Sequence, residues 1–188
     1  NSTLLNSFVS SCDVIVHLAG VNRTQTDQEV YDGNMQLANA LKMAIVATNF
    51  KGHLLFASSS QEKGDSIYGK AKKDARVLLE DTMSTLGGIF TGLIIPNIFG
   101  PFCKPNYNSF VATFCSKIVN HESPEIINDT EVPLLYVGNL VEQILEAIRK
   151  PKESLLEIRP DLEVKVTEVL GLLNTFKDSY IESNTIPS

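Results

Sequence analysis

The sequence has few cysteines, no hydrophobic run long enough to span a bilayer and no basic, signal-peptide-like start. The three cysteines, Cys12, Cys103 and Cys115, are an odd number without the paired spacing of a zinc site. They indicate free thiols in a reducing compartment rather than a disulfide framework, so no metal site is expected. The longest apolar stretch, residues 87–100, is interrupted by a threonine and a proline. We therefore expect a cytoplasmic protein without a membrane span.

The sequence also lacks an excess of basic residues. Its 16 lysines and arginines stand against 22 aspartates and glutamates, which gives a formal net charge of −6. This balance argues against binding to nucleic acids or to anionic membrane surfaces, because both need a basic surface. The hydrophobic content of 43% and a length of 188 residues are typical of a globular domain with a sizeable core.

Short apolar runs alternate with helical patterns along the chain. The runs predicted as strands are residues 13–20, 52–60, 88–101 and 156–160, and the predicted helices are 27–50, 67–87, 108–121 and 167–181, with a brief extended piece and a helix in 133–150. Alternation at these lengths indicates βαβ units. The predicted fold class is α/β, a doubly wound, mostly parallel sheet with helices on both faces.

Small and polar residues follow each of the first three predicted strands. They are Ala19, Gly20, Asn22 and Arg23 after the first strand, Ser58, Ser59 and Ser60 after the second, and Pro96, Asn97 and Gly100 after the third. In such sheets ligands bind beyond the carboxyl ends of the strands, so these residues are expected at one functional edge. Tyr68 and Lys72, at the start of the following helix, lie near the same edge and share one helix face.

The Tyr68 and Lys72 pair has the chemistry of a proton-transfer site. A lysine ammonium one turn away stabilises a phenolate and is expected to lower the pKa of Tyr68 from about 10 towards working pH. With a serine hydroxyl to hold a substrate oxygen, the set can pass a proton to or from a carbinol. The accompanying hydride needs a nicotinamide cofactor.

Each of these features also has a purely structural interpretation. Tyr68 can be an ordinary helix-surface residue, and the serines can cap the next helix. His17, in an apolar strand, is expected to be a packed core residue. The remaining structural interpretations are a solvated helix face for the charge run "KKDAR" (72–76), turn chemistry for Asn97, and loop or N-cap positions for Asn106 and Asn108.

Four motifs in order, "DVIVHLAG", the serine-rich strand end, "YGKAK" and "PNIFGP", resemble the extended short-chain dehydrogenase/reductase superfamily, also called the NAD-dependent epimerase/dehydratase superfamily. The stretches "HLAGVNR" and "PNIFGPFCKPNYNSFVATFCSKIVN" resemble more narrowly the capsular polysaccharide enzyme CapF and its relatives. In those enzymes an NADPH-dependent reductase domain reduces a 4-keto UDP-sugar, and a C-terminal cupin domain acts as an epimerase. The resemblance covers about residues 10–180 and implies a Rossmann-like fold.

The resemblance implies a role for each matching residue. The implied catalytic residues are Ser59, with Ser60 as the competing choice, Tyr68 and Lys72. The implied cofactor-binding residues are Leu18, Ala19, Gly20, Asn34, Ser58, Tyr68, Lys72, Ile95 and Pro96, with Asn34 anchoring the loop after the first strand. The implied substrate-binding residues are Asn97, Asn106, Tyr107 and Asn108. The cofactor is NADP or NAD, with NADPH favoured, the substrate is a UDP-sugar, and a homodimer is expected.

The sequence departs from the family pattern in several places. It has no G-x-x-G-x-x-G turn, which in the family seats the dinucleotide pyrophosphate on a helix N-terminus. A family arginine is Ile94 here, and a family aspartate is replaced by Gly138 and Asn139. The implied architecture is an N-terminally truncated Rossmann-like domain over residues 1–188, with the start of the substrate-binding region at about 100–188.

Two functions remain open at this point. The first is an NAD(P)-dependent nucleotide-sugar oxidoreductase or epimerase. The second is an inactive truncated remnant that binds only a nucleotide sugar or a partner protein. The Ser59, Tyr68 and Lys72 set favours the first, and the lack of a glycine-rich turn favours the second.

Overall fold

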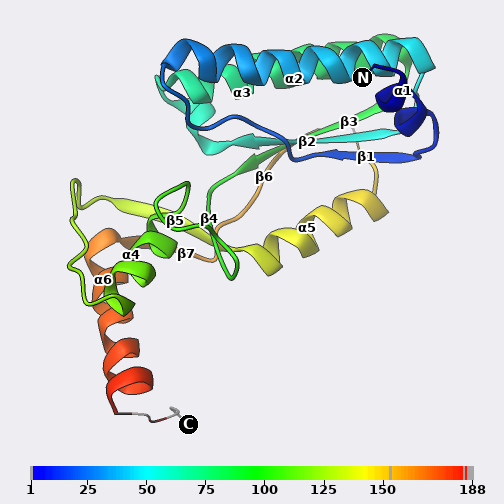
Figure 1. Cartoon of the computed structure of the whole chain (residues 1–188). Coiled ribbons are helices and arrows are strands. Elements are labelled where there is room, and N and C mark those ends of the chain that lie inside the picture. The colour runs from blue at the N-terminus through cyan, green and yellow to red at the C-terminus, as the bar shows by residue number, and fades with distance from the viewer. Residues whose placement is uncertain (1, 153, 184, 186–188) are drawn as a thin grey trace. The chain divides into compact units, whose positions relative to one another are not determined.

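A computed structural model describes residues 2–152, 154–183 and 185 (Figure 1). The chain forms two compact units and passes between them more than once. Unit 1 contains the residues up to Ile95 together with Val141–Ile158, and unit 2 contains Pro96–Leu140 and the residues from Arg159 onward. Each unit has its own sheet.

The sheet of unit 1 is parallel and has the strand order β1-β2-β3-β6. Its strands are β1 (Val14–His17), β2 (His53–Ser59), β3 (Ile89–Ile95) and β6 (Ser154–Glu157). The register places His17 beside Phe56, and Ser59 beside Ile95. The carboxyl ends of three strands therefore meet at one edge, and the predicted α/β class with a parallel sheet is confirmed.

Helices cover both faces of this sheet. They are α1 (Ser2–Ser10), α2 (Asp27–Thr48), α3 (Ile67–Leu86) and the part of α5 (Val137–Arg149) that belongs to unit 1, and a 3₁₀ helix, η1 (Ser60–Lys63), joins β2 to α3. Figure 1 shows α2 and α3 side by side over one face and α5 along the other. The core under α2 and α3 is built from buried aliphatic and aromatic side chains, including Leu41, Ile45, Leu54, Phe56, Leu79 and Phe90.

Local chemistry sets the ends of the two long helices. Thr26 accepts a hydrogen bond from the Glu29 backbone N–H and begins α2, and Ser66 does the same for α3 through Gly69. Helix α3 stops at Gly87, whose φ of 73° is in the left-handed region that glycine adopts without strain. Both helices thus match their predicted positions within two residues.

Unit 2 is a smaller sheet covered by helices. Its elements are β4 (Asn97–Phe99), α4 (Phe110–Val119), β5 (Glu131–Tyr136), β7 (Leu162–Lys165), α6 (Val166–Phe176) and a π-helical segment, η2 (Lys177–Glu182). The strand order is β4-β5-β7, with β5 and β7 antiparallel. Leu134, Val164 and Val169 form its buried cluster.

Several elements differ from the sequence predictions. Helix α1 and strand β7 were not predicted, because a serine-rich nonapeptide has weak helix propensity and four residues carry little periodicity. The stretch 88–101 divides between the two sheets at Pro96, and the last strand of unit 1 lies at 154–157 rather than 156–160. The last α-helix ends at Phe176 and continues as the π-helical segment.

Candidate active site

A buried asparagine holds the loop that follows β1. The Asn34 side chain is 3% exposed, and its Nδ2 donates to the backbone oxygens of Val21 and Val30 at 2.7 Å each. Its Oδ1 accepts from the Val21 backbone N–H at 3.2 Å. The loop exposes three of the residues implied to bind the cofactor: Leu18, Ala19 and Gly20. Asn34 therefore fixes the loop backbone while leaving its outer surface open.

This loop comes close to Lys72 on α3. A Cβ atom placed on Gly20 would lie 3.3 Å from Asn34 Oδ1 and 3.5 Å from Lys72 Nζ. The bare Gly20 backbone therefore lies against the amide and the ammonium group. Three elements that are distant in sequence, the loop after β1, helix α2 and helix α3, thus meet at the predicted edge of the sheet.

The serines at the end of β2 take part in capping. Ser59 Oγ accepts from the Gln61 backbone N–H at 3.2 Å and so begins η1. Ser66 Oγ donates to Gln61 Oε1 at 3.1 Å and accepts from Gly69 N–H at 3.0 Å. The capping interpretation is correct for the Ser59 oxygen, but the cap uses Ser59 only as an acceptor. Its hydroxyl hydrogen is still available for a substrate oxygen.

The first turn of α3 packs tightly on η1 at Gly69, the residue after Tyr68. A Cβ atom at Gly69 would lie only 2.0 Å from the Gln61 backbone oxygen. No side chain fits there unless the backbone of η1 or of α3 moves. Gly69 is therefore required for the close packing of the first turn of α3, which contains Tyr68, on η1.

We predict opposite stability effects for alanine at two helical glycines. Gly69→Ala should lower the free energy of unfolding by about 1–3 kcal/mol through overpacking. Gly171→Ala is the matched control, because Gly171 lies in α6 and its added Cβ would meet nothing within 4 Å. It should raise the free energy of unfolding by about 0.5–1 kcal/mol through helix propensity. Urea unfolding measures both, and a stability unchanged by Gly69→Ala would contradict the tight packing.

Lys72 is a buried cation. Its side chain is 3% exposed, and among the described residues it forms no salt bridge. Its Nζ lies 4.5 Å from the centroid of the Phe56 ring, a cation–π contact. Burial lowers the pKa of Lys72 to about 8, and the negative charge of Glu62 opposes this decrease. A buried ammonium without an ion pair at an open loop matches a polar ligand such as a sugar hydroxyl.

His17 is packed on the same aromatic ring. Its imidazole stacks on Phe56 with ring centroids 5.3 Å apart. Burial, and then the charge of Lys72, lower the pKa of His17 to about 4, so the ring is neutral at physiological pH. His17 Nδ1 is buried without a hydrogen-bond partner in the described part of the chain. A neutral His17 adds no second positive charge beside Lys72.

The expected decrease in the pKa of Tyr68 was wrong in direction. Partial burial raises the pKa of Tyr68 above its ordinary value, because the phenolate loses hydration, and Lys72 is not among the causes of this shift. Sharing a helix face does not bring the ammonium close enough to compensate, since the Lys72 side chain lies over Phe56. Tyr68 is therefore held as a neutral phenol, which is a proton donor.

The interpretation of the run 72–76 as a solvated helix face was also wrong for two of its cations. Lys72 and Arg76 are 3% and 8% exposed. Arg76 pairs with Glu62 at 3.0 Å, and both side chains are at least nine-tenths buried. Sequence analysis assigned no role to Glu62, Phe56 or Arg76. The available signal was the spacing of Tyr68, Lys72 and Arg76, which are four residues apart on one helix face.

The remaining implied site residues lie at the end of β3 and in unit 2. Ile95 is the last residue of β3, buried beside Ser59, and Pro96 follows it, half-buried. Asn97 is exposed in β4. Asn106, Tyr107 and Asn108 lie in the exposed loop before α4, where the Asn106 backbone N–H donates to Thr113 Oγ1 at 2.9 Å. Asn106 has a left-handed φ of 55°, so this loop turns sharply there.

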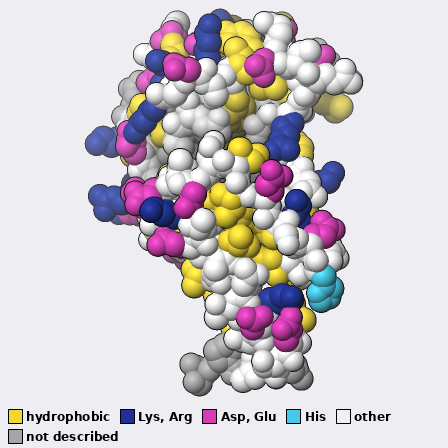
Figure 2. Space-filling model, turned by 90° about the vertical axis from the view of Figure 1, so that its left-hand side faces the viewer, with side chains coloured by type: hydrophobic (Ala, Val, Ile, Leu, Met, Phe, Trp, Pro, Cys, Tyr) yellow, Lys and Arg dark blue, Asp and Glu magenta, His cyan; other side chains and the backbone are white. Residues whose placement is uncertain are grey.

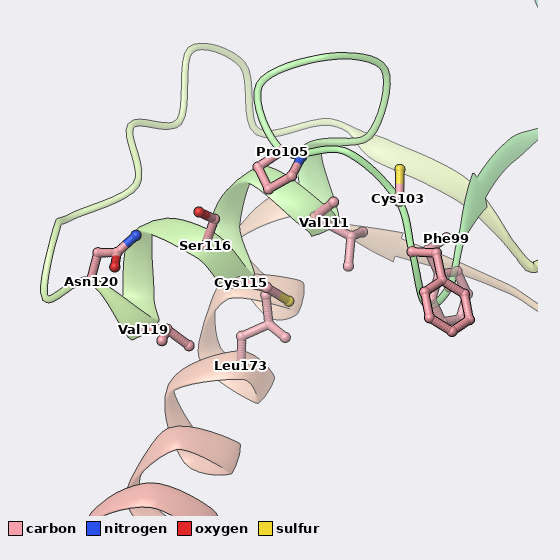
Figure 3. A pocket seen from close by; sticks show the side chains of 12 residues that line it. Phe99, Cys103, Pro105, Val111, Cys115, Ser116, Val119, Asn120 and Leu173 are labelled. Atoms are coloured by element: carbon pink, nitrogen blue, oxygen red, sulfur yellow. The ribbon is translucent and has the colours of Figure 1, made fainter.

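Unit 2 contains an apolar cavity of about 580 Å³ (Figure 3). Cys115 on α4 and Leu173 on α6 point toward each other in it, and Cys103 lies on the loop above. Burial raises the pKa of the Cys115 thiol, so it is protonated, and both cysteines are free. The lining contains none of the implied substrate residues and few hydrogen-bond donors, so it does not match a diphosphate.

Hydrophobic side chains also reach the surface of unit 2. Those that are at least half exposed include Phe102, Val119, Ile127 and Leu172. Figure 2 shows such side chains interspersed with charged ones on one face of the molecule. Within the described ranges no helix is long and apolar enough to cross a membrane, and no group of three or more His, Cys, Asp or Glu side chains is arranged to hold a metal ion.

The fold and this edge define a Rossmann-like α/β protein with a serine, a tyrosine and a lysine around the carboxyl ends of parallel strands. The sequence model of the NAD dependent epimerase/dehydratase family matches residues 1–158, and the chain belongs to this family.

Relatives and solved structures agree with this assignment. The chain is 33% identical over 178 residues to UDP-2-acetamido-2,6-beta-L-arabino-hexul-4-ose reductase of Pseudomonas aeruginosa, covering 93% of this chain and 48% of that protein. It is 33% identical to the capsular polysaccharide assembling protein CapF of Staphylococcus aureus, with a TM-score of 0.82, covering 97% of this chain and 50% of CapF. UDP-glucose 4-epimerase of Thermotoga maritima shares the fold with a TM-score of 0.84 at 19% identity, covering 94% of this chain and 65% of that one. The chain thus spans about half the length of the first two proteins.

Proposed function

We propose that this chain carries the active-site residues of an NAD(P)-dependent nucleotide-sugar oxidoreductase that reduces a 4-keto UDP-sugar for capsular or other surface polysaccharide. The observation that carries the proposal is the edge where Ser59 ends β2 and Tyr68 and Lys72 begin α3, beside an open loop pinned by Asn34. The names of the two proteins that are 33% identical to the chain, a 4-ulose reductase and CapF, support the substrate class.

The protonation state of Tyr68 favours the direction of reduction. Because burial raises its pKa, Tyr68 is a neutral phenol that donates its proton to the carbonyl oxygen as the alcohol forms. Ser59, whose oxygen already accepts from Gln61, donates its hydroxyl hydrogen to the same carbonyl oxygen. Lys72 does not act on this phenol in the free protein, because its ammonium lies over Phe56, so its proposed part is to bind the cofactor. A nicotinamide cofactor, when bound, supplies the hydride.

The proposed binding residues come from both units of the chain. Leu18, Ala19 and Gly20 line the cofactor from the loop after β1, with Ser58, Ile95 and Pro96 near the nicotinamide, and Lys72 reaching a ribose hydroxyl. Asn97, Asn106, Tyr107 and Asn108 contact the UDP-sugar. NADPH is the favoured cofactor, and the working enzyme is a cytoplasmic homodimer. The fit for the cofactor is the open loop with Gly20 next to the buried Lys72 ammonium, which forms no salt bridge with any described residue.

Ligand titrations test this function directly. NADPH and NADH are titrated into the protein while nicotinamide fluorescence is followed, and a UDP-sugar is titrated by calorimetry. Saturable binding of a nicotinamide cofactor and of the UDP-sugar is the expected result. Binding of the UDP-sugar without either cofactor would support the alternative of a nucleotide-sugar-binding module. Binding of neither would contradict the proposed enzyme and leave the alternative of a partner-binding module.

A further inference from the structure

A single carboxylate connects the two elements that carry the proposed catalytic residues, β2 and α3, with the 3₁₀ helix between them. Glu62 on η1 has a side chain that is 7% exposed. Its Oε1 accepts from Ser58 Oγ, next to Ser59 at the end of β2. Both of its oxygens accept from Arg76 on α3, through Nε at 3.1 and 3.2 Å and Nη2 at 3.0 Å. Glu62 therefore joins β2, η1 and α3 at one point.

Arg76 holds this carboxylate rigidly. The guanidinium contacts Glu62 through two nitrogens, and its third, Nη1, bonds Glu80 Oε2 at 2.9 Å. Its stem packs on the bare Gly92 backbone of β3, since a Cβ there would lie 2.8 Å from Arg76 Cδ. A planar fork with two hydrogen bonds fixes both the position and the orientation of a carboxylate.

The fixed carboxylate lies beside the place of the Lys72 ammonium, because Ser58 and Arg76 bind Glu62 while Lys72 lies over Phe56. Phe56 and Ser58 are alternate residues of β2 and so lie on the same face of the strand. Tyr68, Lys72 and Arg76 follow one another at intervals of four residues, so they share one face of α3. The groups that face the Lys72 ammonium are His17 from β1, the Phe56 ring from β2, Glu62 from η1 and the Asn34 amide from α2. On its own helix, Arg76 is held by Glu62 and Glu80. Of the groups that face the ammonium, Glu62 is the anion, and its charge raises the pKa of Lys72 against the effect of burial.

We propose that Glu62 is a positioning residue, clamped by Arg76 and Ser58, that provides the fixed buried counter-charge of Lys72 and holds the serine end of β2 against α3. The inference rests on the proposed function, because the residues that Glu62 would position, Ser59, Tyr68 and Lys72, are the proposed catalytic residues. The charge coupling between Glu62 and Lys72 is a property of the protein without substrate, so it is measurable on its own.

The titration of Lys72 tests this coupling. Lysine labelled with ¹³C reports the charge of each ammonium through the Cε chemical shift, and Lys72→Met assigns the signal. The wild-type midpoint is expected near pH 8. Glu62→Gln should move it about one pH unit lower, because an opposite charge nearby typically shifts a pKa by at least that amount. At pH 7 the uncharged fraction of Lys72 would then rise about fivefold.

Glu80→Gln is the matched control. Glu80 also pairs with Arg76, but it is partly exposed and lies two turns from Lys72. This variant should leave the Lys72 midpoint at its wild-type value. Glu62→Asp, which keeps the charge, should restore most of the shift. A midpoint unchanged by Glu62→Gln would overturn the proposal even if the variant were less stable, because a purely structural role predicts that result.

A double variant covers the case in which Glu62→Gln does not fold. Glu62→Gln with Arg76→Met removes both charges of the buried pair, a replacement that proteins often tolerate. Its Lys72 midpoint should lie below that of Arg76→Met alone, because these two proteins differ only in the charge of Glu62, and equal midpoints would overturn the proposal. A wild-type protein that binds no nucleotide would contradict the proposed function and leave this coupling intact, so the two failures are distinguishable.

Discussion

Tyr68→Phe is expected to reduce the turnover of a 4-keto UDP-sugar by about 10²–10⁴-fold, the usual contribution of a positioned proton donor. The substitution removes one oxygen and keeps the ring that packs at the start of α3. The affinity for the nicotinamide cofactor and the free energy of unfolding should therefore change little. Single-turnover oxidation of NADPH in the presence of the keto-sugar measures the chemical step apart from product release.

A second tyrosine provides the control for this experiment. Tyr180 is half exposed in the π-helical segment of unit 2 and has no part in the proposed site. Tyr180→Phe should leave turnover within about twofold of the wild type. If Tyr68→Phe retained turnover at that level, Tyr68 would be an ordinary helix residue and the proposed mechanism would fail.

Lys72→Met is expected to abolish cofactor binding and, at the same time, to stabilise the fold. The ammonium is buried without a salt bridge among the described residues, and its pKa falls from 10.5 to about 8. Keeping it charged at neutral pH costs about 3 kcal/mol of folding free energy, at 1.36 kcal/mol for each pKa unit. Methionine fills similar space without a charge, so we expect the free energy of unfolding at pH 7 to rise by about 1–3 kcal/mol.

The pH dependence of stability separates this effect from simple repacking. Below pH 8 Lys72 is charged in both the folded and the unfolded chain, and its penalty is constant. Between about pH 8 and 10.5 the folded protein releases this proton while the unfolded chain keeps it, so wild-type stability gains from Lys72 as pH rises. The advantage of Lys72→Met over the wild type should therefore shrink across that range.

Lys73→Met is the control for the loss of a lysine charge. Lys73 is the exposed neighbour of Lys72, and its replacement should change stability by no more than about 0.5 kcal/mol. Equilibrium unfolding in urea at pH 7 and pH 10 compares the three proteins. A Lys72→Met protein that was less stable than the wild type at both pH values would show that the buried ammonium does not weaken the fold.

The results expected for Tyr68→Phe and Lys72→Met describe a site whose residues favour ligand binding at a cost in folding stability. Lys72 is held in a place where its charge is costly, over Phe56 and beside the neutral His17. Active sites commonly carry such perturbed groups, because the interaction that is missing in the free protein is made with the ligand. The neutral phenol of Tyr68 is thus the proposed proton donor of this site, and the buried cation of Lys72 is its proposed contact to the bound cofactor.

The amino-acid sequence by itself determined the fold class, most of the elements of unit 1 and the candidate residues of the site. The alternation of apolar runs and helical periods is a local property, so α2 and α3 were predicted within two residues. In the structure Thr26, Ser66 and Gly87 set their ends through equally local contacts. The edge that gathers Gly20, Ser59, Tyr68 and Lys72 also follows from chain order, because parallel strands place their carboxyl ends together.

Only the tertiary structure decided the electrostatics of the sheet edge that carries the proposed site, and the division of the chain into two units. The pKa values of Tyr68 and Lys72 depend on how much water each group loses and on which charges from other elements face it, and neither is encoded in their spacing. The burial of Arg76, its pairing with Glu62 and the exchange of the chain between two sheets at Pro96 arise from contacts between segments far apart in sequence. Such contacts form only when the elements pack, and for that reason the charged run on α3 was misinterpreted and the role of Glu62 was missed.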